Sequence, residues 1–172
     1  MFKVGDTVLY GVCGVCKIEN IEKKSFGSTD QNYYVLVPVR DNRSTFFVPV
    51  NSEILVSKMR FVMSAEVINS AMIDNKNTVE WIENDRKRGE IFKKLATGGN
   101  FKETLALVRC IHNHSKEISG SGKKLHKNDE MLCKAALKIL YEEISFNIQI
   151  TNEEAEDMIF NNKSLENLIK TV

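Results

Sequence analysis

Two cysteines separated by two residues, Cys13 and Cys16, are the side chains of this sequence best spaced to do chemistry. Such a pair suits a zinc ion or a redox-active dithiol. A zinc site needs a second pair of ligands, but Cys110, His112 and His114 come far later, and their spacing on a helix directs the side chains apart. A redox pair should open a helix, whereas this pair lies between two strand-like segments. We therefore expect buried structural cysteines and no metal site.

The sequence also lacks a recognisable catalytic arrangement. His126 is isolated in a basic loop, and His112 and His114 have no obvious nucleophile beside them. We find no Ser-His-Asp order, no Gly-x-Ser-x-Gly motif and no phosphate-binding glycine loop. The sequence therefore predicts a protein that is not an enzyme, has no catalytic residues, and uses no cofactor or small-molecule substrate.

A third group of residues has the chemistry of nucleic-acid binding. Trp81 is the only tryptophan, and it is followed by three cations, Arg86, Lys87 and Arg88. A large planar apolar side chain can wedge into an opened base step while neighbouring cations hold phosphates. A tryptophan also commonly packs one helix on its neighbour, and this alternative stays open.

Charge is distributed unevenly along the chain. Residues 81–140 hold 13 basic and 7 acidic side chains, a net charge of +6, whereas residues 141–172 hold 2 and 7, a net charge of −5. A strongly basic segment followed by an acidic one is typical of a protein with a polyanionic partner. The alternative is an ordinary solvated helical surface with an acidic tail.

The elements that must position these residues change in kind near residue 60. Four segments rich in β-branched and aromatic residues predict strands, over about residues 2–10, 15–22, 33–39 and 44–50. Pro38 and Pro49 cannot donate to a ladder, so we expect each of them at a strand end or on an edge strand. The first part of the chain is therefore expected to form a small, strongly bent sheet or half-barrel.

The rest of the chain has the periodicity of helices. From Phe61 onward apolar residues recur every three or four positions. Thr78 is expected to cap a helix that runs to about Ala96, which would place Trp81 in its first turn. Further helices are expected after Asn100, around residues 132–144, and after a capping box at Thr151.

These patterns predict an α+β protein, with a β module in residues 1–57 and an all-α domain in residues 58–172. No apolar run approaches the ~20 residues of a membrane-spanning helix, and the N-terminus has no pattern of a secretory signal. We therefore expect a cytoplasmic protein with reduced thiols and no membrane partner.

Six parts of the chain carry a family resemblance through their order and spacing, although no single one is highly specific: residues 2–10, Gly14, 34–36, 45–50, 95–98 and 136–140. Together they resemble the CarD/CdnL family of bacterial transcription regulators. The N-terminal part is also similar to the polymerase-interacting module of transcription-repair coupling factors.

The resemblance implies a Tudor-like half-barrel followed by a compact helical domain. It implies that the β module binds the β-subunit lobe of RNA polymerase through a strand edge, where main-chain groups can accept another strand. The protein would then be associated with the bacterial nucleoid through the polymerase. Phe47 stands where the family commonly has a basic residue, which would make the contact apolar. The expected polymerase-binding residues are Lys24, Phe46, Phe47 and Val48.

The resemblance also implies that the helical domain contacts promoter DNA at the upstream edge of the transcription bubble. The family's wedge tryptophan lies closer to the Leu95–Gly98 turn, and an ungapped count places that position at Asn84, one helical turn after Trp81. In a helix that includes these positions, residues 81, 84, 85 and 88 would share a face. The expected DNA-binding residues are Trp81, Asn84, Arg86, Lys87, Arg88, Lys123, Lys124 and Lys127.

The function expected from these features is that of a transcription regulator. It would bind the polymerase β lobe, contact upstream promoter DNA with little sequence specificity, and stabilise the open complex. One alternative is a protein-interaction module without DNA binding, in which the basic residues only solvate the surface. A second alternative is a small metal-dependent enzyme built on Cys13 and Cys16.

Overall fold

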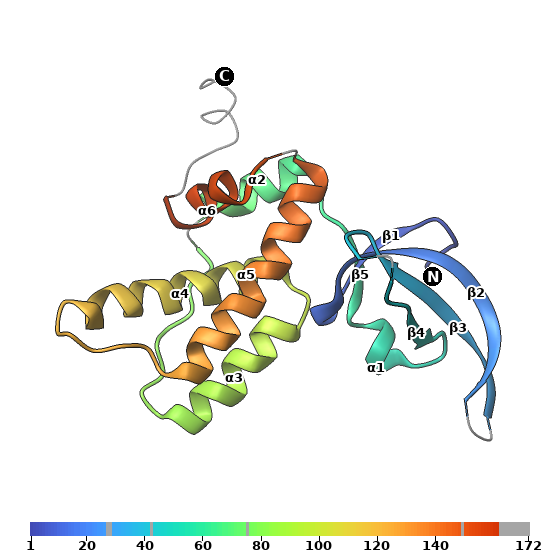
Figure 1. Cartoon of the computed structure of the whole chain (residues 1–172), viewed down its shortest axis with the longest axis horizontal. Coiled ribbons are helices and arrows are strands. Elements are labelled where there is room, and N and C mark those ends of the chain that lie inside the picture. The colour runs from blue at the N-terminus through green and yellow to red at the C-terminus, as the bar shows by residue number, and fades with distance from the viewer. Residues whose placement is uncertain (27–28, 42, 75, 149, 162–172) are drawn as a thin grey trace. The chain divides into compact units, whose positions relative to one another are not determined.

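The structure, a computed structural model, describes residues 1–26, 29–41, 43–74, 76–148 and 150–161. The chain separates into two compact units, Met1–Val62 and Met63–Val172, here called unit 1 and unit 2. Unit 1 is an antiparallel sheet and unit 2 is helical, so the predicted α+β fold class is confirmed (Figure 1).

Within unit 1, the residues that the structure describes form a five-stranded antiparallel sheet with the strand order β4-β3-β2-β1-β5. A 3₁₀ turn, Gly11–Cys13, joins the first two strands, and a short helix, α1 (Glu53–Val56), follows the fourth. The strands are β1 (Thr7–Tyr10), β2 (Gly14–Phe26), β3 (Thr29–Pro38), β4 (Phe46–Pro49) and β5 (Met59–Phe61).

The sheet is bent, as the sequence predicts and as a Tudor-like β domain requires. The pairing of β2 with β3 shifts register between Ile18 and Asn20, and such a bulge bends and twists a strand. The long strands β2 and β3 curve together as a ribbon (Figure 1). Side chains from all five strands form the small core of unit 1, and each is fully or nearly fully buried: Val8, Cys16, Ile18, Tyr34, Leu36, Val48 and Met59.

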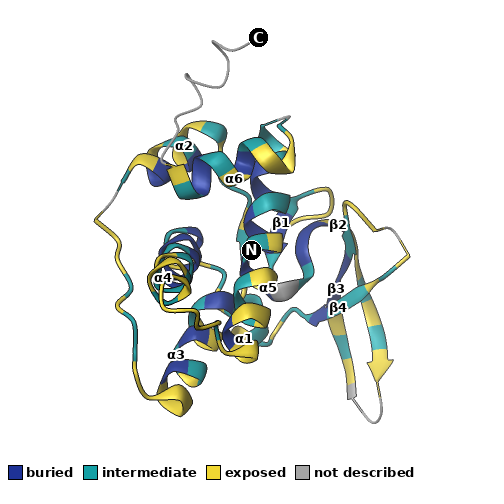
Figure 2. Cartoon of the chain, turned by 60° about the vertical axis from the view of Figure 1, so that its left-hand side comes forward, coloured by how far each residue is buried: buried dark blue, intermediate teal, exposed yellow. Residues whose placement is uncertain are grey.

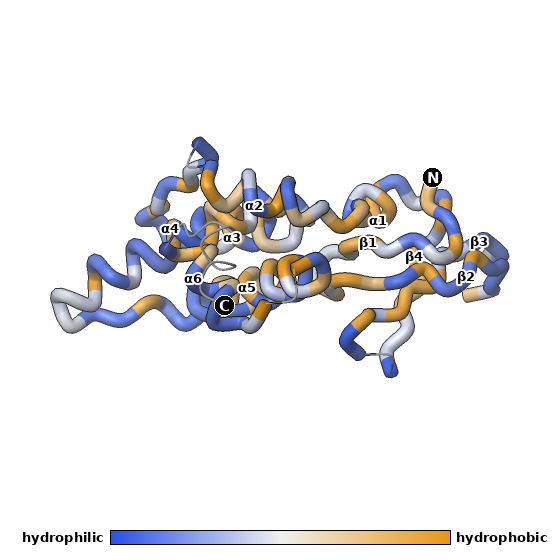
Figure 3. The backbone as a smooth tube through the Cα atoms, turned by 90° about the horizontal axis from the view of Figure 1, so that it is seen from above, coloured by the Kyte–Doolittle hydropathy of each residue, from blue (hydrophilic) through white to orange (hydrophobic). Residues whose placement is uncertain are grey.

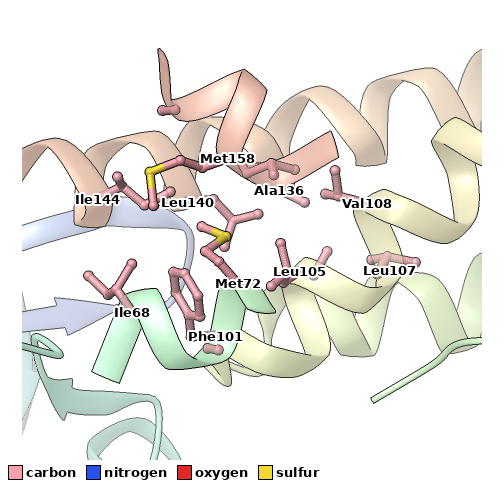
Figure 4. Close-up of a cluster of buried hydrophobic side chains, with 14 of the residues drawn as sticks. Ile68, Met72, Phe101, Leu105, Leu107, Val108, Ala136, Leu140, Ile144 and Met158 are labelled. Carbon is pink, nitrogen blue, oxygen red and sulfur yellow. The ribbon is translucent and has the colours of Figure 1, made fainter. Parts of the chain in front are cut away.

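The described residues of unit 2 form five helices around a separate apolar core. They are α2 (Ala65–Ile73), α3 (Asp85–Thr97), α4 (Phe101–Ser119), α5 (Lys127–Asn147) and α6 (Asn152–Asn161). Each helix turns its apolar side inward, and Figure 2 shows the buried residues as stripes along the helices. Figure 4 shows side chains from α2, α4, α5 and α6 meeting in this core, among them Met72, Leu105, Leu140 and Met158.

Local capping fixes where most of these helices begin. Asn100 accepts hydrogen bonds from the main-chain N–H groups of Lys102 and Glu103, and so starts α4 where the sequence predicts. Thr151 and Glu154 form the predicted capping box, because the main-chain N–H of each donates to the side chain of the other.

The predicted start of α3 is wrong. Thr78 does not cap a helix, and α3 begins only at Asp85, after a non-helical segment. Asn84 is the cap, since its side-chain oxygen accepts from the main-chain N–H of Lys87 at 2.9 Å. None of the described helices is long and apolar enough to cross a membrane.

Candidate functional sites

Strand β4 forms one edge of the sheet in unit 1, and among the described residues it pairs only with β3. The N–H of Val50 donates to the carbonyl of Asn32 at 2.9 Å, so these two residues form a hydrogen-bonded pair. The neighbouring pair, Tyr33 and Pro49, is therefore one without direct hydrogen bonds. Because hydrogen-bonded and open pairs alternate, the main-chain groups of Phe47 and Pro49 point away from β3. The open edge therefore presents the N–H and C=O of Phe47, while Pro49 supplies no donor.

The side chains of β4 alternate between the two faces of the sheet. Val48 is fully buried in the core of unit 1, and Phe46 packs against that core from the same face. Phe47 lies on the opposite face and is half-buried, so neither phenylalanine is fully exposed. Of the three predicted polymerase-binding residues on this strand, only Phe47 combines an outward side chain with outward main-chain groups.

Phe47 belongs to an aromatic patch, defined here as Phe26, Tyr33 and Phe47 with Lys24. The ring of Phe26 lies 5.5 Å from that of Phe47 and 5.1 Å from that of Tyr33. The Lys24 ammonium lies 4.1 Å from the centre of the Phe47 ring and also pairs with Glu22 at 3.1 Å. Phe26 is 53% exposed, so the patch reaches solvent beside the open edge.

In unit 2, Trp81 lies in the non-helical segment before α3 rather than in the helix. Its indole is stacked on the imidazole of His114, with ring centres 3.6 Å apart, and the guanidinium of Arg88 lies 4.4 Å from the ring centre. The imidazole and the guanidinium would overlap if both lay on one face of the indole at these distances. They therefore lie on opposite faces, with the indole between them. Phe92 packs against it edge to face at 5.8 Å. Trp81 is therefore a packed residue whose two faces are both covered.

Arg88 is an internal link between helices, with only 4% of the residue exposed. Its Nε and Nη2 donate to the buried carboxylate of Asp129, and Nη2 also donates to Asp85 at 2.6 Å. Its Nη1 donates to the carbonyls of Ile82 and Glu83. All five guanidinium donors are thus accounted for. The hydrogen bonds with Asp129, and then with Asp85, raise the pKa of Arg88.

The expectation that residues 81, 84, 85 and 88 share a helix face is wrong, because α3 begins at Asp85. Asn84 is exposed, but its side-chain oxygen is occupied by the helix cap. Its amide nitrogen has no acceptor among the described residues, so this group is the one left to donate to a ligand.

The structure does bring together several of the predicted DNA-binding residues. Trp81, Arg88, Lys123 and Lys124 line one depression of about 320 Å³, which also includes His114 and His126. Within the part of the chain that is described, the ammonium groups of Lys123 and Lys124 have no carboxylate partner, and both residues are exposed. The turn that carries them, after α4, is coloured mostly hydrophilic or neutral in Figure 3.

The remaining predicted cations lie outside this depression. Arg86 is exposed and pairs with Glu90 at 3.3 Å, one turn along α3. Lys87 is exposed on the same helix, and Lys127 is exposed at the start of α5. The six basic residues considered in the sequence thus divide into five exposed cations and one buried cation, Arg88.

Two residues of this site, His114 and Asp129, were missed from the sequence. Asp129 is 41 positions from Arg88, and a single acidic residue in the first turn of a helix gives no indication of a distant partner. His114 lies on α4 near its end, where nothing in the local pattern indicates a stack with Trp81. Only the fold reveals both pairings.

The cysteine pair lies where β1 passes into β2. Cys16 is buried, Cys13 is half-buried, and neither is in a disulfide. Burial, and after it the charge of the Cys13 and Cys16 thiols, raises the pKa of Tyr10. Among the described residues, no group of three or more His, Cys, Asp or Glu side chains could hold a metal ion.

Comparison with known proteins adds two findings. Residues 2–60 match the model of the CarD-like/TRCF RID domain family. The chain is also 30% identical over 135 residues to the Bacillus subtilis (strain 168) protein named "Putative transcription factor YdeB", an alignment that covers 74% of this chain and 84% of the relative. The match to the relative thus extends well beyond the β module.

Proposed function

The chain belongs to the CarD/CdnL family of bacterial transcription regulators and carries its RNA-polymerase-interacting domain, and from this premise we propose that it joins the polymerase β lobe to upstream promoter DNA. In this proposal unit 1 binds the polymerase and unit 2 binds DNA with little sequence specificity. Tighter binding to melted than to closed promoter would stabilise the open complex by the difference in affinity.

The observation that carries the polymerase contact is the open edge at Phe47. A strand of the β lobe can pair with the outward N–H and C=O of this residue, which is the usual chemistry of strand addition. The aromatic patch beside the edge offers apolar surface for the side chains of that strand. Phe46 and Val48 contribute by holding β4 against the core, and Lys24 contributes a cation at the rim of the patch.

The DNA contact is proposed to rest on the exposed cations of unit 2. Lys123, Lys124 and Lys127 can hold phosphates, as can Arg86 and Lys87 on α3. Three or four such contacts would give a log–log dependence of affinity on salt with a slope of about −3.

Trp81 and Arg88 act in this proposal by supporting that surface rather than by touching DNA. Their contacts hold the segment before α3 against the helices, and so fix where Asn84 and the cations lie. The amide nitrogen of Asn84, the position that matches the family's wedge tryptophan, is the group proposed to reach the minor groove.

A specific observation also favours the alternative of a protein-interaction module without DNA binding. All N–H donors of the Arg88 guanidinium form hydrogen bonds inside unit 2, and Arg86 is paired with Glu90. The number of free cations is therefore smaller than the sequence suggests. Three or four phosphate contacts must come mainly from lysines.

Two substitutions in the full chain test the proposal together. Phe47→Ala should weaken binding to core RNA polymerase by about tenfold, because it removes an anchor at the edge, and should leave DNA affinity unchanged. Lys124→Ala should do the reverse, and flatten the salt slope for forked DNA by about 1. Lys17→Ala, an exposed lysine on β2, is the matched control for both measurements.

The two measurements test the polymerase contact and the DNA contact separately. Unchanged polymerase binding by Phe47→Ala would contradict the contact at the β4 edge. No binding of the wild-type chain to forked DNA at low salt would contradict the DNA contact and select the protein-interaction module.

A further inference from the structure

Unit 2 contains a second cavity, of about 310 Å³, that shares no lining residue with the depression around Trp81. The segment before α3, one side of α4, and the last turn of α6 form its walls. The residues that line it are Asn77, Thr78, Val79, Ala106, Arg109, Cys110, Asn113 and Phe160. A volume of this size is at the lower end of what small-molecule sites occupy.

The charged group of this cavity is the half-buried guanidinium of Arg109. Its Nε donates to the carbonyl of Ile159 at 2.7 Å, and its Nη2 donates to the carbonyl of Met72 at 2.8 Å. These carbonyls lie near the C-terminal ends of α6 and α2, which favour a cation. The two bonds fix the plane of the guanidinium and use two of its five N–H donors.

Arg109 has no carboxylate within ion-pair distance among the described residues. It differs in this from Arg88, the other substantially buried arginine of unit 2, which has two carboxylate partners. Burial without a counterion lowers the pKa of Arg109, although a guanidinium remains charged at neutral pH. A bound anion would supply the missing negative charge and accept from the unused N–H donors.

The apolar lining residues of the cavity are Val79, Ala106 and Phe160. Phe160 is stacked on His112, with ring centres 4.0 Å apart and planes 23° apart. His112 does not line the cavity, so the part of the Phe160 ring that faces the cavity is not the face that His112 covers. Val79 and the small Ala106 extend this apolar surface and leave room beside the ring.

The rim of the cavity offers polar groups that are not engaged elsewhere. Asn77, Thr78 and Asn113 are exposed, and their side chains have no hydrogen-bond partner among the described residues. Together with the charge of Arg109 and the ring of Phe160, these polar side chains can bind a small anion that carries an aromatic ring.

We propose that this cavity binds a small aromatic anion, with its ring against Phe160 and its carboxylate or phosphate on Arg109. Aryl carboxylates and nucleoside monophosphates both have this chemistry. The site is separate from the proposed polymerase and DNA contacts, so it stands or falls independently of them.

Titration of the ¹⁵N-labelled full chain tests the proposal. Benzoate and AMP serve as the two aromatic anions, benzamide and adenosine as their neutral counterparts, and acetate and inorganic phosphate as anions without a ring. At least one aromatic anion should give saturable amide shifts in residues 77–79, 106–113 and 160, and bind about tenfold or more tightly than its neutral counterpart. Saturation by benzoate identifies the aryl carboxylate class, and saturation by AMP identifies the nucleotide class.

Three results would overturn the proposal. They are equal affinity for the charged and the neutral compound, equal affinity for the anion without a ring, and an absence of saturation by both benzoate and AMP up to about 10 mM.

Substitutions locate the site. Arg109→Gln should weaken binding of the aromatic anion by about tenfold or more, because a hydrogen-bonded charge is lost. Arg109 also holds two helix ends, so Asn113→Ala provides a second variant at an exposed position without side-chain bonds, expected to weaken binding several-fold. Lys134→Ala, at an exposed position of α5 that lines neither cavity, is the matched control and should bind the aromatic anion like the wild type. Wild-type affinity in both Arg109→Gln and Asn113→Ala would overturn the assignment.

Alkylation of cysteines gives an independent measurement. Cys110 lines the cavity, whereas Cys13 lies in unit 1, and both are half-buried. A saturating aromatic anion should slow the alkylation of Cys110, followed by mass spectrometry, and leave the rate at Cys13 unchanged. Equal rates at Cys110 with and without the anion would contradict occupancy of the cavity.

Discussion

Each unit of this protein places a cation over an aromatic ring, but the two pairs are built differently. In unit 1, Lys24 lies over Phe47 at 4.1 Å, and its side chain is 37% exposed. In unit 2, Arg88 lies over Trp81 at 4.4 Å, and its side chain is 5% exposed. The first pair sits beside an open sheet edge, while the second is enclosed by His114 and tied to Asp129. A cation beside an aromatic ring can therefore form part of a surface that binds a partner, or it can hold elements together in the interior.

What separates the two cases is the counterion. Lys24 pairs with Glu22 in the same strand at the surface, where such pairs contribute little. Arg88 pairs with a carboxylate from another helix that is itself 2% exposed, so each charge depends on the other for its burial. The sharpest way to test the comparison is to remove each cation in turn.

Arg88→Ala should have the largest effect, a loss of about 3–5 kcal/mol in the unfolding free energy of unit 2, because it leaves the Asp129 carboxylate buried without a partner. Lys24→Ala should change the stability of unit 1 by less than about 1 kcal/mol. Trp81 is the only tryptophan, so denaturation followed by its fluorescence reports on unit 2 alone, and circular dichroism can follow both units. Similar losses in the two variants would break the comparison.

Trp81→Ala should cost about 3 kcal/mol of stability in unit 2, since the indole contacts three side chains and leaves a cavity when removed. Circular dichroism during denaturation measures this loss without the fluorophore. Trp81→Phe, which keeps an aromatic ring between Arg88 and His114, should recover much of it. A Trp81→Ala variant with wild-type stability and a shortened open-complex lifetime would instead identify Trp81 as an exposed wedge.

The two proposed contacts should also differ in their response to salt. DNA affinity should fall by about 60-fold between 50 and 200 mM salt if the log–log slope is about −3. Polymerase affinity should change by less than about threefold, because main-chain bonds and aromatic surface are screened little. Parallel titrations of the same preparation measure both. A steep salt dependence of polymerase binding would show that Phe47 does not dominate that contact.

The smallest expected effect concerns pH, and all three histidines lie in unit 2. Burial, followed by the charge of Lys116, lowers the pKa of His112 below its ordinary value, against a smaller opposing effect of Glu156. The unfolded chain therefore binds this proton more readily, so unit 2 should lose stability as the pH falls through about 6.5.

His112→Phe, which keeps a ring stacked on Phe160, should reduce the pH dependence of the stability of unit 2. The stability of unit 1 should not change. Fluorescence-detected denaturation at pH 5 and pH 8 gives the comparison. An unchanged pH dependence in the variant would assign the effect to other groups.

Patterns that depend on neighbours in sequence were predicted well. The strands predicted over about residues 15–22 and 33–39, and the caps at Asn100 and Thr151, are local features, and the structure confirms them. The family resemblance, based on short segments in order, also holds. Strand β5 was missed because three residues are too few to show a period, and it forms only by pairing with β1.

Features that depend on distant partners could not be predicted. The start of α3 was placed too early because Thr78 and Asn84 are both good caps, and only the fold shows that Arg88 binds the carbonyls just before Asn84. The sequence likewise counted Arg88 among the surface cations, because its partner Asp129 lies on α5. Local charge therefore overestimated the free positive surface of unit 2.

The proline at the end of β4 has a consequence for the solubility of the protein. An open sheet edge with apolar side chains beside it is a template for other copies of the same chain, and for aggregation. Pro49 lies at an outward-facing position of that edge and offers no N–H, so an added strand gains hydrogen bonds at Phe47 but cannot continue the ladder past it. So few hydrogen bonds suffice only for a strand whose side chains also pack on the aromatic patch. They are too weak to bind a strand whose side chains do not.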